Sequence, residues 1–344
     1  MVDNKKEEKA NETHIINRVL VLGNGFDLAV GRRTTYKDFY DSKYCPKNYP
    51  APLINYLNGK WGDNLENVRW LDLETALQEY AENPSKEDYY NKAEESAITT
   101  FFNGNMPQNI SLYNQIIGIL DEENRLPSRE DREFYKLYFG KSKGRREEDA
   151  LKEIEQGLSD YLLSEGENKY WKQDTKAIEL LKEYLKDDYS SIYSFNYTHV
   201  ENLVSSENEK INVYDAKFHY MHGSLSCGHV IIGAKDGKYG DYDFIQKSFD
   251  EEYKSSTLLD DMKKADEVVI YGHSLGDCDS QYFKRFFNDL VSEQRERNKK
   301  KKKITIYTYD KNSEIQIKKN LNMLTDYRLS WLYSSCDVEI IKSK

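Results

Sequence analysis

The stretch that most constrains this chain is Arg18–Tyr40, with the sequence RVLVLGNGFDLAVGRRTTYKDFY. It opens with a short apolar run, Val19–Leu22, and a run of this kind bounded by glycine predicts a buried strand of a parallel sheet. Gly23–Gly25 follows at once, and Phe26–Val30 suits the start of a helix. A strand, a glycine-rich turn and a helix together predict an anion site. Glycines let the backbone approach phosphate, and N–H groups at the helix N-terminus point towards it.

This motif alone does not decide between a ligand site and a plain tight turn. The dinucleotide-binding fingerprint has a third glycine where this chain has Leu28,. The fingerprint also has an acidic residue at the end of a second strand about 20 residues further on, and no such strand is evident here. The strand ends further along the chain are therefore needed to choose.

Strands and helices alternate in the second half of the chain. Apolar, β-branched runs predict strands at residues 191–195, 218–221, 230–232, 267–271, 304–309 and 338–341. Helical patterns lie between several of them, at residues 257–264, 280–297 and 312–322. Such alternation with short loops predicts an α/β protein with a Rossmann-like parallel sheet and helices on both faces.

Between the first and second strands the pattern is mostly helical. Apolar residues recur at helical spacing in residues 73–80, 112–120, 150–163 and 177–185,. We therefore expect a large helical insertion at residues 51–185, between the two parts of a nucleotide-binding core at residues 15–50 and 186–344. Residues 1–14 are polar and charged and are expected to form a flexible N-terminal arm,.

Composition and charge narrow the class of protein. The 344 residues carry a formal net charge of -10, which argues against general binding to nucleic acid, because that affinity comes largely from neutralised phosphates. No run approaches the roughly 18 apolar residues of a membrane span, and the N-terminus lacks the apolar segment of a secretory signal. The four cysteines form no CxxC pair, so neither a zinc site nor a disulfide framework is expected. These features predict a cytoplasmic protein that binds neither membranes nor a metal.

Glycines and polar residues follow the predicted strands, at the edge where the carboxyl ends of a parallel sheet open on one crevice. They are Gly23, Asn24, Gly25, Asp27, Asn196, Thr198, His222, Gly272, Ser274 and Asp310. Glycine turns hold phosphate, a carboxylate can hold ribose hydroxyls, and an amide and an imidazole remain for chemistry. The set as a whole predicts a site for a phosphorylated nucleoside.

Each polar residue of this set also has a purely structural interpretation. Asn196 can form a turn, and His222 can be a hydrogen-bonded core histidine. Asp27 and Asp310 can cap helices. The remaining histidines with a structural interpretation are His199, His219, His229 and His273.

One of the glycine turns also suggests a different enzyme class. Gly272–Gly276 matches G-x-S-x-G, the nucleophile elbow of α/β-hydrolases, and follows a predicted strand,. That fold needs a general-base histidine after the serine in the chain, and no histidine follows Ser274. A glycine-rich strand end that holds ribose or phosphate is therefore the better interpretation.

Several segments together resemble the AbiH family of bacterial abortive-infection proteins. They are LVLGNGFDLAVGRRTTYKDF, WLDLE, SFNYTHVENL, HYMHGSL and VVIYGHSLGDCDSQYF, in this order along the chain. More distantly, the series resembles the sirtuin-like NAD-cleaving fold. In that resemblance Gly23–Gly25 matches the first glycine turn, Asn196 the catalytic asparagine and His222 the catalytic histidine. Gly272 and Ser274 match a later glycine–serine turn.

The resemblance implies an antiphage effector that hydrolyses NAD at the nicotinamide–ribose bond. It implies that Asn196 orients ribose or water, that His222 acts as general base and that Asp310 contacts ribose. Glu74, in WLDLE, is a further candidate that would reach in from the insertion, and its structural interpretation is a surface helix residue. The four-cysteine zinc module of sirtuin deacylases has no counterpart here, so the implied activity is that of an NAD glycohydrolase without a metal.

Partners and two other function classes complete the expectations. An effector of this kind is expected to be held inactive until a phage-derived trigger arrives, and assembly into homo-oligomers is a common way to do so. The alternatives are a sensor that binds NAD or a related nucleotide without turnover, and a nuclease-type toxin. A nuclease would need metal-binding carboxylates clustered at strand ends, and the sequence offers only isolated ones.

Overall fold

The computed structural model describes residues 17–49, 51–61, 72–82, 143–166, 171–200, 203, 218–225, 228–292 and 301–343. The predicted N-terminal arm, residues 1–14, and the helical pattern at residues 112–120 lie outside these residues. Among the helices so described, none combines the length and the apolar composition that crossing a bilayer requires.

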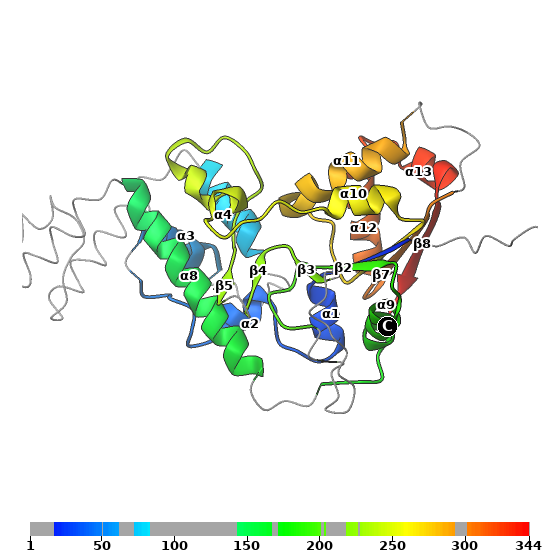
Figure 1. The fold of residues 1–344 in the computed structure, drawn as a ribbon. Helices are drawn as coiled ribbons and strands as arrows, with labels where there is room; N and C mark the ends of the chain where they lie inside the picture. The colour runs from blue at the N-terminus through cyan, green and yellow to red at the C-terminus, as the bar shows by residue number, and fades with distance from the viewer. Residues whose placement is uncertain are drawn as a thin grey trace, which may run out of the picture.

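A six-stranded sheet, parallel throughout, forms the centre of the fold (Figure 1). In spatial order its strands are β3 (Phe218–Tyr220), β2 (Ser190–Ser194), β1 (Arg18–Leu22), β6 (Glu267–Tyr271), β7 (Lys303–Thr308) and β8 (Asp337–Lys342). From β1 the chain adds β2 and β3 on one side of the sheet, and it then adds β6, β7 and β8 on the other side of β1. This order confirms the predicted Rossmann-like α/β fold and places its topological switch point between β1 and β6.

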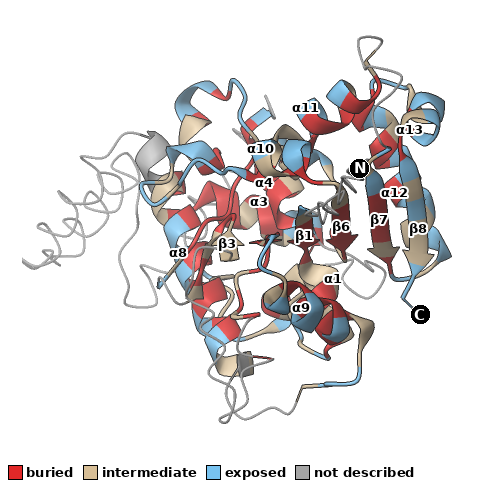
Figure 2. Ribbon diagram, turned by 45° about the vertical axis from the view of Figure 1, so that its right-hand side comes forward, coloured by how far each residue is buried: buried red, intermediate tan, exposed pale blue. Residues whose placement is uncertain are grey.

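Helices cover both faces of the sheet, as predicted. Val19 and Val21 of β1 belong to one buried cluster, whereas Leu20 and Leu22 belong to another, because successive side chains of a strand point to opposite faces. The first cluster includes residues of α10 (Leu258–Lys264), α11 (Ser280–Leu290), α12 (Lys311–Leu324) and α13 (Leu329–Ser335). The second includes residues of α1 (Asn24–Ala29) and α9 (Lys176–Lys186), which lie on the other side of the strands from α11 (Figure 2).

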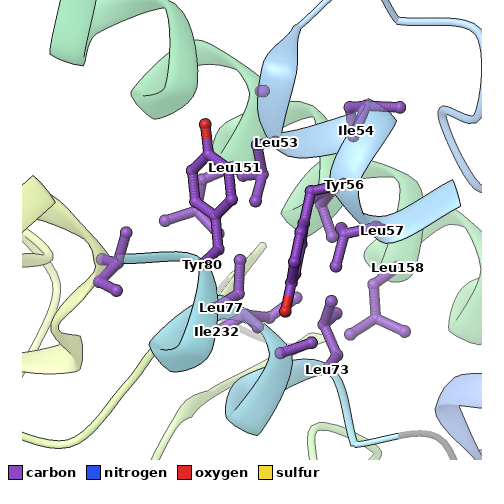
Figure 3. Close-up of a cluster of buried hydrophobic side chains, with 14 of the residues drawn as sticks. Leu53, Ile54, Tyr56, Leu57, Leu73, Leu77, Tyr80, Leu151, Leu158 and Ile232 are labelled. Carbon is purple, nitrogen blue, oxygen red and sulfur yellow. The ribbon is translucent and has the colours of Figure 1, made fainter. Parts of the chain in front are cut away.

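A separate hydrophobic core holds a helical unit beside the sheet. It joins α2 (Tyr36–Asp41), α3 (Pro52–Trp61), α4 (Leu73–Glu82) and α8 (Lys143–Gly166). Tyr56 and Tyr80 pack at its centre with their rings 5.3 Å apart (Figure 3). Burying each large apolar side chain of this kind contributes about 1.5–3 kcal/mol to folding, so the unit has a core of its own.

Two segments pack differently from the predicted division of the chain. Residues 177–185 lie in the predicted insertion, but the helix they form, α9, packs on the sheet. Residues 230–232 were expected to form a strand of the sheet. Instead β5 (His229–Val230) pairs antiparallel with β4 (Gly223–Ser224), and Ile232 packs in the core of the helical unit. An apolar run shows that a segment is buried, but it does not show which of two cores covers it.

The register of the strands brings the predicted site together. Leu22 pairs with Ser194 on one side and with Tyr271 on the other, and Ser194 pairs with Tyr220. The carboxyl ends of β1, β2, β3 and β6 are therefore level, and the turns that follow them meet at one edge of the sheet.

Candidate functional site

A cavity lies at this edge, beside the switch point. It has a volume of about 180 Å³, whereas one water needs roughly 10–15 Å³, so the space admits a ligand of several non-hydrogen atoms. Of the residues predicted to bind or react, the lining includes Gly23, Asn24, Asp27, Glu74, Asn196, Thr198, His222, Gly272 and Ser274. The helical unit contributes Glu74 of α4 and Leu158 and Leu162 of α8 to the same walls.

Asn196 is the least satisfied polar side chain of the cavity. It follows β2 and is 5% exposed, and neither its Oδ1 nor its Nδ2 atom has a hydrogen-bond partner among the described residues. The turn at this residue is held by its backbone N–H, which donates to Ser194 Oγ at 3.2 Å. A buried amide without partners costs about 1–3 kcal/mol, so its position is one that a ligand with both donors and acceptors would satisfy.

The glycines of the two turns first serve to bring backbones together. A Cβ atom on Gly25 would lie 2.6 Å from the Cα of Gly272, and one on Gly23 would lie 2.5 Å from the Cα of His273. Gly272 itself has φ +66°, a conformation that favours glycine. Several N–H groups of the first turn bond within the protein: Gly23 donates to the carbonyl of Tyr271 and Gly25 to that of Gly272. These two amides are therefore not available to a phosphate, and Gly25 does not line the cavity.

Asp27 is held by an ion pair and does not cap α1. Its Oδ1 accepts from Arg32 at 2.9 Å and its Oδ2 accepts from Thr198 Oγ1 at 2.6 Å. The N-cap of α1 is Gly23 instead. Burial raises the pKa of the Asp27 carboxyl, and Arg32 and Thr198 oppose that effect. The hydrogen bond from Thr198 ties the segment after β1 to the turn after β2, which carries Asn196.

Asn24 and Ser274 take part in local contacts at the cavity wall. The Asn24 side chain donates to the Thr34 carbonyl at 3.2 Å and accepts from Thr34 Oγ1. Ser274 is exposed and its Oγ accepts from the Gly276 N–H at 3.2 Å. The residue with φ +53° in this turn is Leu275, so the serine does not occupy the strained position of a nucleophile elbow.

A buried lysine that the sequence analysis did not identify lies against the cavity. Lys247 is fully buried, and its Nζ donates to Glu74 Oε2 and to Asp279 Oδ1, each at 2.9 Å. His222 Nε2 lies 3.3 Å from the same Nζ. Burial disfavours the charge on Lys247, but Asp279 and Glu74 outweigh it and hold its pKa well above the usual 10.5. The ammonium group thus donates to two carboxylates and lies against the imidazole of His222,.

Asp279 joins this lysine to two histidines. Its Oδ1 lies 3.3 Å from His222 Nε2, and its Oδ2 lies 3.2 Å from His273 Nε2. His273 Nδ1 accepts from the Leu275 N–H at 2.9 Å, so the proton of His273 is on Nε2 and is donated to Asp279. Burial raises the pKa of Asp279, but Lys247 and His222 reverse this and hold it well below 3.8.

His222 is uncharged at neutral pH in this setting. Burial and the neighbouring Lys247 lower its pKa from 6.5 to about 3, although Asp279 acts in the opposite direction. It packs edge-on against Phe195, the residue before Asn196, with ring centroids 5.2 Å apart. The two residues predicted to carry the chemistry therefore line one cavity from adjacent strand ends.

Glu74 has the titration that a general acid or base needs. Burial raises its pKa from 4.5 to about 7; Lys247 lowers it and Asp279 raises it further. Its second oxygen, Oε1, accepts from Tyr36 at 3.4 Å, and Tyr36 lies 3.3 Å from the hydroxyl of Tyr197. Efficient general bases have a pKa near the working pH, so Glu74 is a stronger candidate than its sequence context suggested.

Asp310 is placed away from these residues. Its Oδ1 accepts from the Ser313 N–H at 2.8 Å and caps α12, and it is not among the residues that line the cavity. Of the residues that were missed, Asp279 had a usable signal, because it follows the end of β6 as the other site residues follow theirs. Lys247 follows no strand of the sheet, and no feature of its sequence context distinguishes it from other lysines.

A family model described as bacteriophage abortive infection AbiH matches residues 19–326. The matched range contains every residue of the cavity described above. No curated protein and no solved structure matches the chain.

Proposed function

The chain belongs to the AbiH family of bacteriophage abortive infection proteins, and on that premise we propose that its cavity binds NAD and hydrolyses the nicotinamide–ribose bond. The cell would then lose NAD when the protein is triggered by infection. The proposal extends to the cytoplasm as the compartment, a phage-derived trigger and a homo-oligomer as the active or resting assembly.

The observation that carries the proposal is the unpartnered amide of Asn196 in a cavity at the switch point. Ligands of open α/β sheets bind in this crevice, and Asn196 presents both a buried acceptor and a buried donor there. Ribose hydroxyls and the carboxamide of nicotinamide supply the complementary groups. An apolar ligand would leave the amide unsatisfied, so a polar nucleoside fits the site better.

The reaction assigns one role to each polar side chain. A water oxygen attacks the ribose carbon that carries nicotinamide, the electron pair of the broken C–N bond leaves with neutral nicotinamide, and the water proton passes to a base. Because the transition state resembles an oxocarbenium ion, the carboxylates near the cavity stabilise it. Glu74, with a pKa of about 7, is the proton acceptor in this scheme. Neutral His222 and Asn196 hold the ribose and the water by hydrogen bonds.

Purified protein mixed with NAD tests the proposal directly. Nicotinamide and ADP-ribose should appear in equal amounts, and Asn196→Ala, His222→Ala and Glu74→Gln should each abolish their release. Asp310→Asn is the matched control, because this residue caps α12 outside the cavity, and it should keep its activity. Full turnover in Asn196→Ala would remove that residue from the mechanism.

The pH profile distinguishes Glu74 from His222 as the base. A base must be ionised to accept the proton, so kcat/KM should rise with pH and level off above about 7, the pKa of Glu74,. If His222 were the base, activity should instead persist down to about pH 3. Measurement of kcat/KM between these limits decides which group accepts the proton.

A nucleotide sensor without turnover is the second candidate. It is favoured by the position of His222, whose Nε2 already faces Lys247 and Asp279. A sensor would bind NAD with the same dependence on Asn196 but release no nicotinamide. The nuclease alternative has less support, because Lys247 occupies the space between the Glu74 and Asp279 carboxylates where a catalytic metal would have to lie.

A further inference from the structure

A second group of metal-ligating side chains lies away from the cavity. Glu155 of α8, His229 of β5 and Asp250, which follows the short helix Lys247–Phe249, each offer one ligand atom, and these atoms lie within 4.8 Å of one another. None of the three lines the cavity. They come from three separate segments of the chain, so the fold itself brings them together.

The charges of this group are not balanced within the described part of the chain. Glu155 is 7% exposed, and its Oε1 accepts from the Ile232 N–H at 3.1 Å. No lysine or arginine among the described residues pairs with Glu155 or with Asp250, whose Oδ2 lies 2.8 Å from His229 Nε2. A buried carboxylate is stabilised when it pairs with a cation or binds a metal, and a metal ion at this position would supply that partner to Glu155.

We propose that Glu155, His229 and Asp250 form a binding site for a divalent metal ion, Zn²⁺ in the first instance. One imidazole nitrogen and two carboxylate oxygens suit Zn²⁺, which accepts mixed nitrogen and oxygen ligands and takes a water as its fourth ligand. His229 and Asp250 are only partly buried, so the ion can enter from solvent. The site does not depend on whether the cavity cleaves NAD.

The position of the group defines what the ion does. His229 pairs across the hairpin with Ser224, two residues after His222, and Asp250 donates its N–H to the carbonyl of Lys247. The ion therefore ties α8 to the two segments that carry His222 and Lys247 into the candidate site. It acts as a brace behind the cavity and contacts no reacting atom.

Metal binding to the full chain tests the proposal without any activity assay. Protein first stripped with a chelator should bind about one equivalent of added Zn²⁺ per chain in equilibrium dialysis, and the ion should raise the midpoint of thermal unfolding. Glu155→Gln keeps the acceptor for Ile232 but loses the charge. It should weaken binding at least about tenfold and abolish the rise in the midpoint.

Matched variants keep the result interpretable. Glu153→Gln, an exposed position on the same helix, and His219→Gln should bind the ion as the parent does. Asp250→Asn provides a second test from a different segment if Glu155→Gln does not fold. Mn²⁺, which prefers oxygen ligands to thiolates, should bind more weakly and lose affinity in the same variants. Zinc retained equally by Glu155→Gln and Asp250→Asn would place it on cysteines elsewhere and overturn the proposal, as would the absence of stoichiometric binding.

Discussion

Asn196 is the clearest case of a residue that the fold alone does not explain. The sequence left open that it is a simple turn residue, but its side chain is buried and makes no hydrogen bond within the part of the chain that the structure describes. A position selected for stability alone would not keep such an amide, because an unsatisfied buried group costs free energy. Residues that break a local rule in this way tend to mark functional sites.

Replacement of Asn196 by leucine should therefore stabilise the protein while it removes function. The change keeps the branched shape of the side chain and removes two unsatisfied atoms, so we expect the free energy of unfolding to rise by about 1 kcal/mol or more, measured by urea denaturation. Asn55→Ala is the matched control, since Asn55 Nδ2 is also unpartnered but lies on α3 outside the cavity. It should be equally harmless to the fold and leave NAD turnover intact. A large loss of stability in Asn196→Leu would show that the amide has a partner in the folded protein.

His222 should make the protein sensitive to acid. Its pKa in the folded chain, about 3, lies below the unfolded value of 6.5, so the unfolded chain binds more protons between these values. The stability that neutral His222 contributes is then fully present above pH 6.5 and is lost as pH falls towards 3. Relative to His222→Asn, the parent should lose up to about 1.4 kcal/mol of unfolding free energy per pH unit in this window. Parallel slopes for the two proteins in urea titrations across this range would mean that His222 is already charged.

At the scale of elements, the contact between the turns after β1 and β6 sets the geometry of the cavity edge. Gly25 and Gly272 approach so closely that neither tolerates a Cβ atom. The glycine-rich motif predicted either an anion site or a tight turn after the first strand, but its spacing could not show that the glycines serve this backbone contact first. That information depends on the pairing of β1 with β6, and these strands are far apart in sequence.

Gly272→Ala should distort this edge. A Cβ atom there would lie 2.5 Å from the Gly25 carbonyl carbon, and the residue has φ +66°, so we expect a loss of about 2 kcal/mol or more of unfolding free energy. Gly59→Ala is the matched control on α3, where a Cβ atom meets nothing within 4 Å. It should gain about 0.5–1 kcal/mol. Equal stabilities in the two variants would contradict the close packing of the turns.

Lys247 joins three elements, since it links the segment after β5 to Glu74 of α4 and to Asp279 next to α11. Lys247→Met removes the shared cation and leaves two buried carboxylates without it. This should cost about 3–5 kcal/mol, measured by chemical denaturation. Lys152→Met breaks an exposed pair with Glu148 and should change stability by less than about 1 kcal/mol. A small effect of Lys247→Met would mean that Glu74 is already protonated and needs no partner.

The sheet could be predicted and the ionic cluster could not, for a physical reason. The strands can be recognised in the sequence because a strand buried on both faces must be apolar along its length. Once the sheet is taken to be parallel, the residues that follow β1, β2, β3 and β6 are expected at one edge of it. Lys247 is positioned instead by the short helix η4 (Lys247–Phe249) and by its ion pairs with Glu74 and Asp279. Long-range charge pairing has no periodicity, so it leaves no pattern in one sequence.

At the scale of the whole molecule, the cavity lies between two cores that pack separately. Gly23, Asn196 and Gly272 belong to the edge of the sheet, whereas Glu74 and Leu158 come from helices of the other core. The helical unit lies beside the sheet in Figure 1, and it supplies part of the cavity wall, so a ligand held there would contact both parts. A ligand bound between them should therefore stabilise both.

Hydrogen exchange with NAD on an inactive variant, His222→Asn, measures this coupling. At a free NAD concentration of about 100 Kd, openings that release the ligand should become about 100-fold rarer. We expect slower exchange in α4, in the part of α8 around Leu158 and in the turn after β6. The helix α13 and the edge strand β8, which do not line the cavity, serve as internal controls and should exchange at unchanged rates.

Protection confined to the sheet turns would show that the helical unit does not close on the ligand. Equal protection of β8 would instead indicate general stabilisation of the fold.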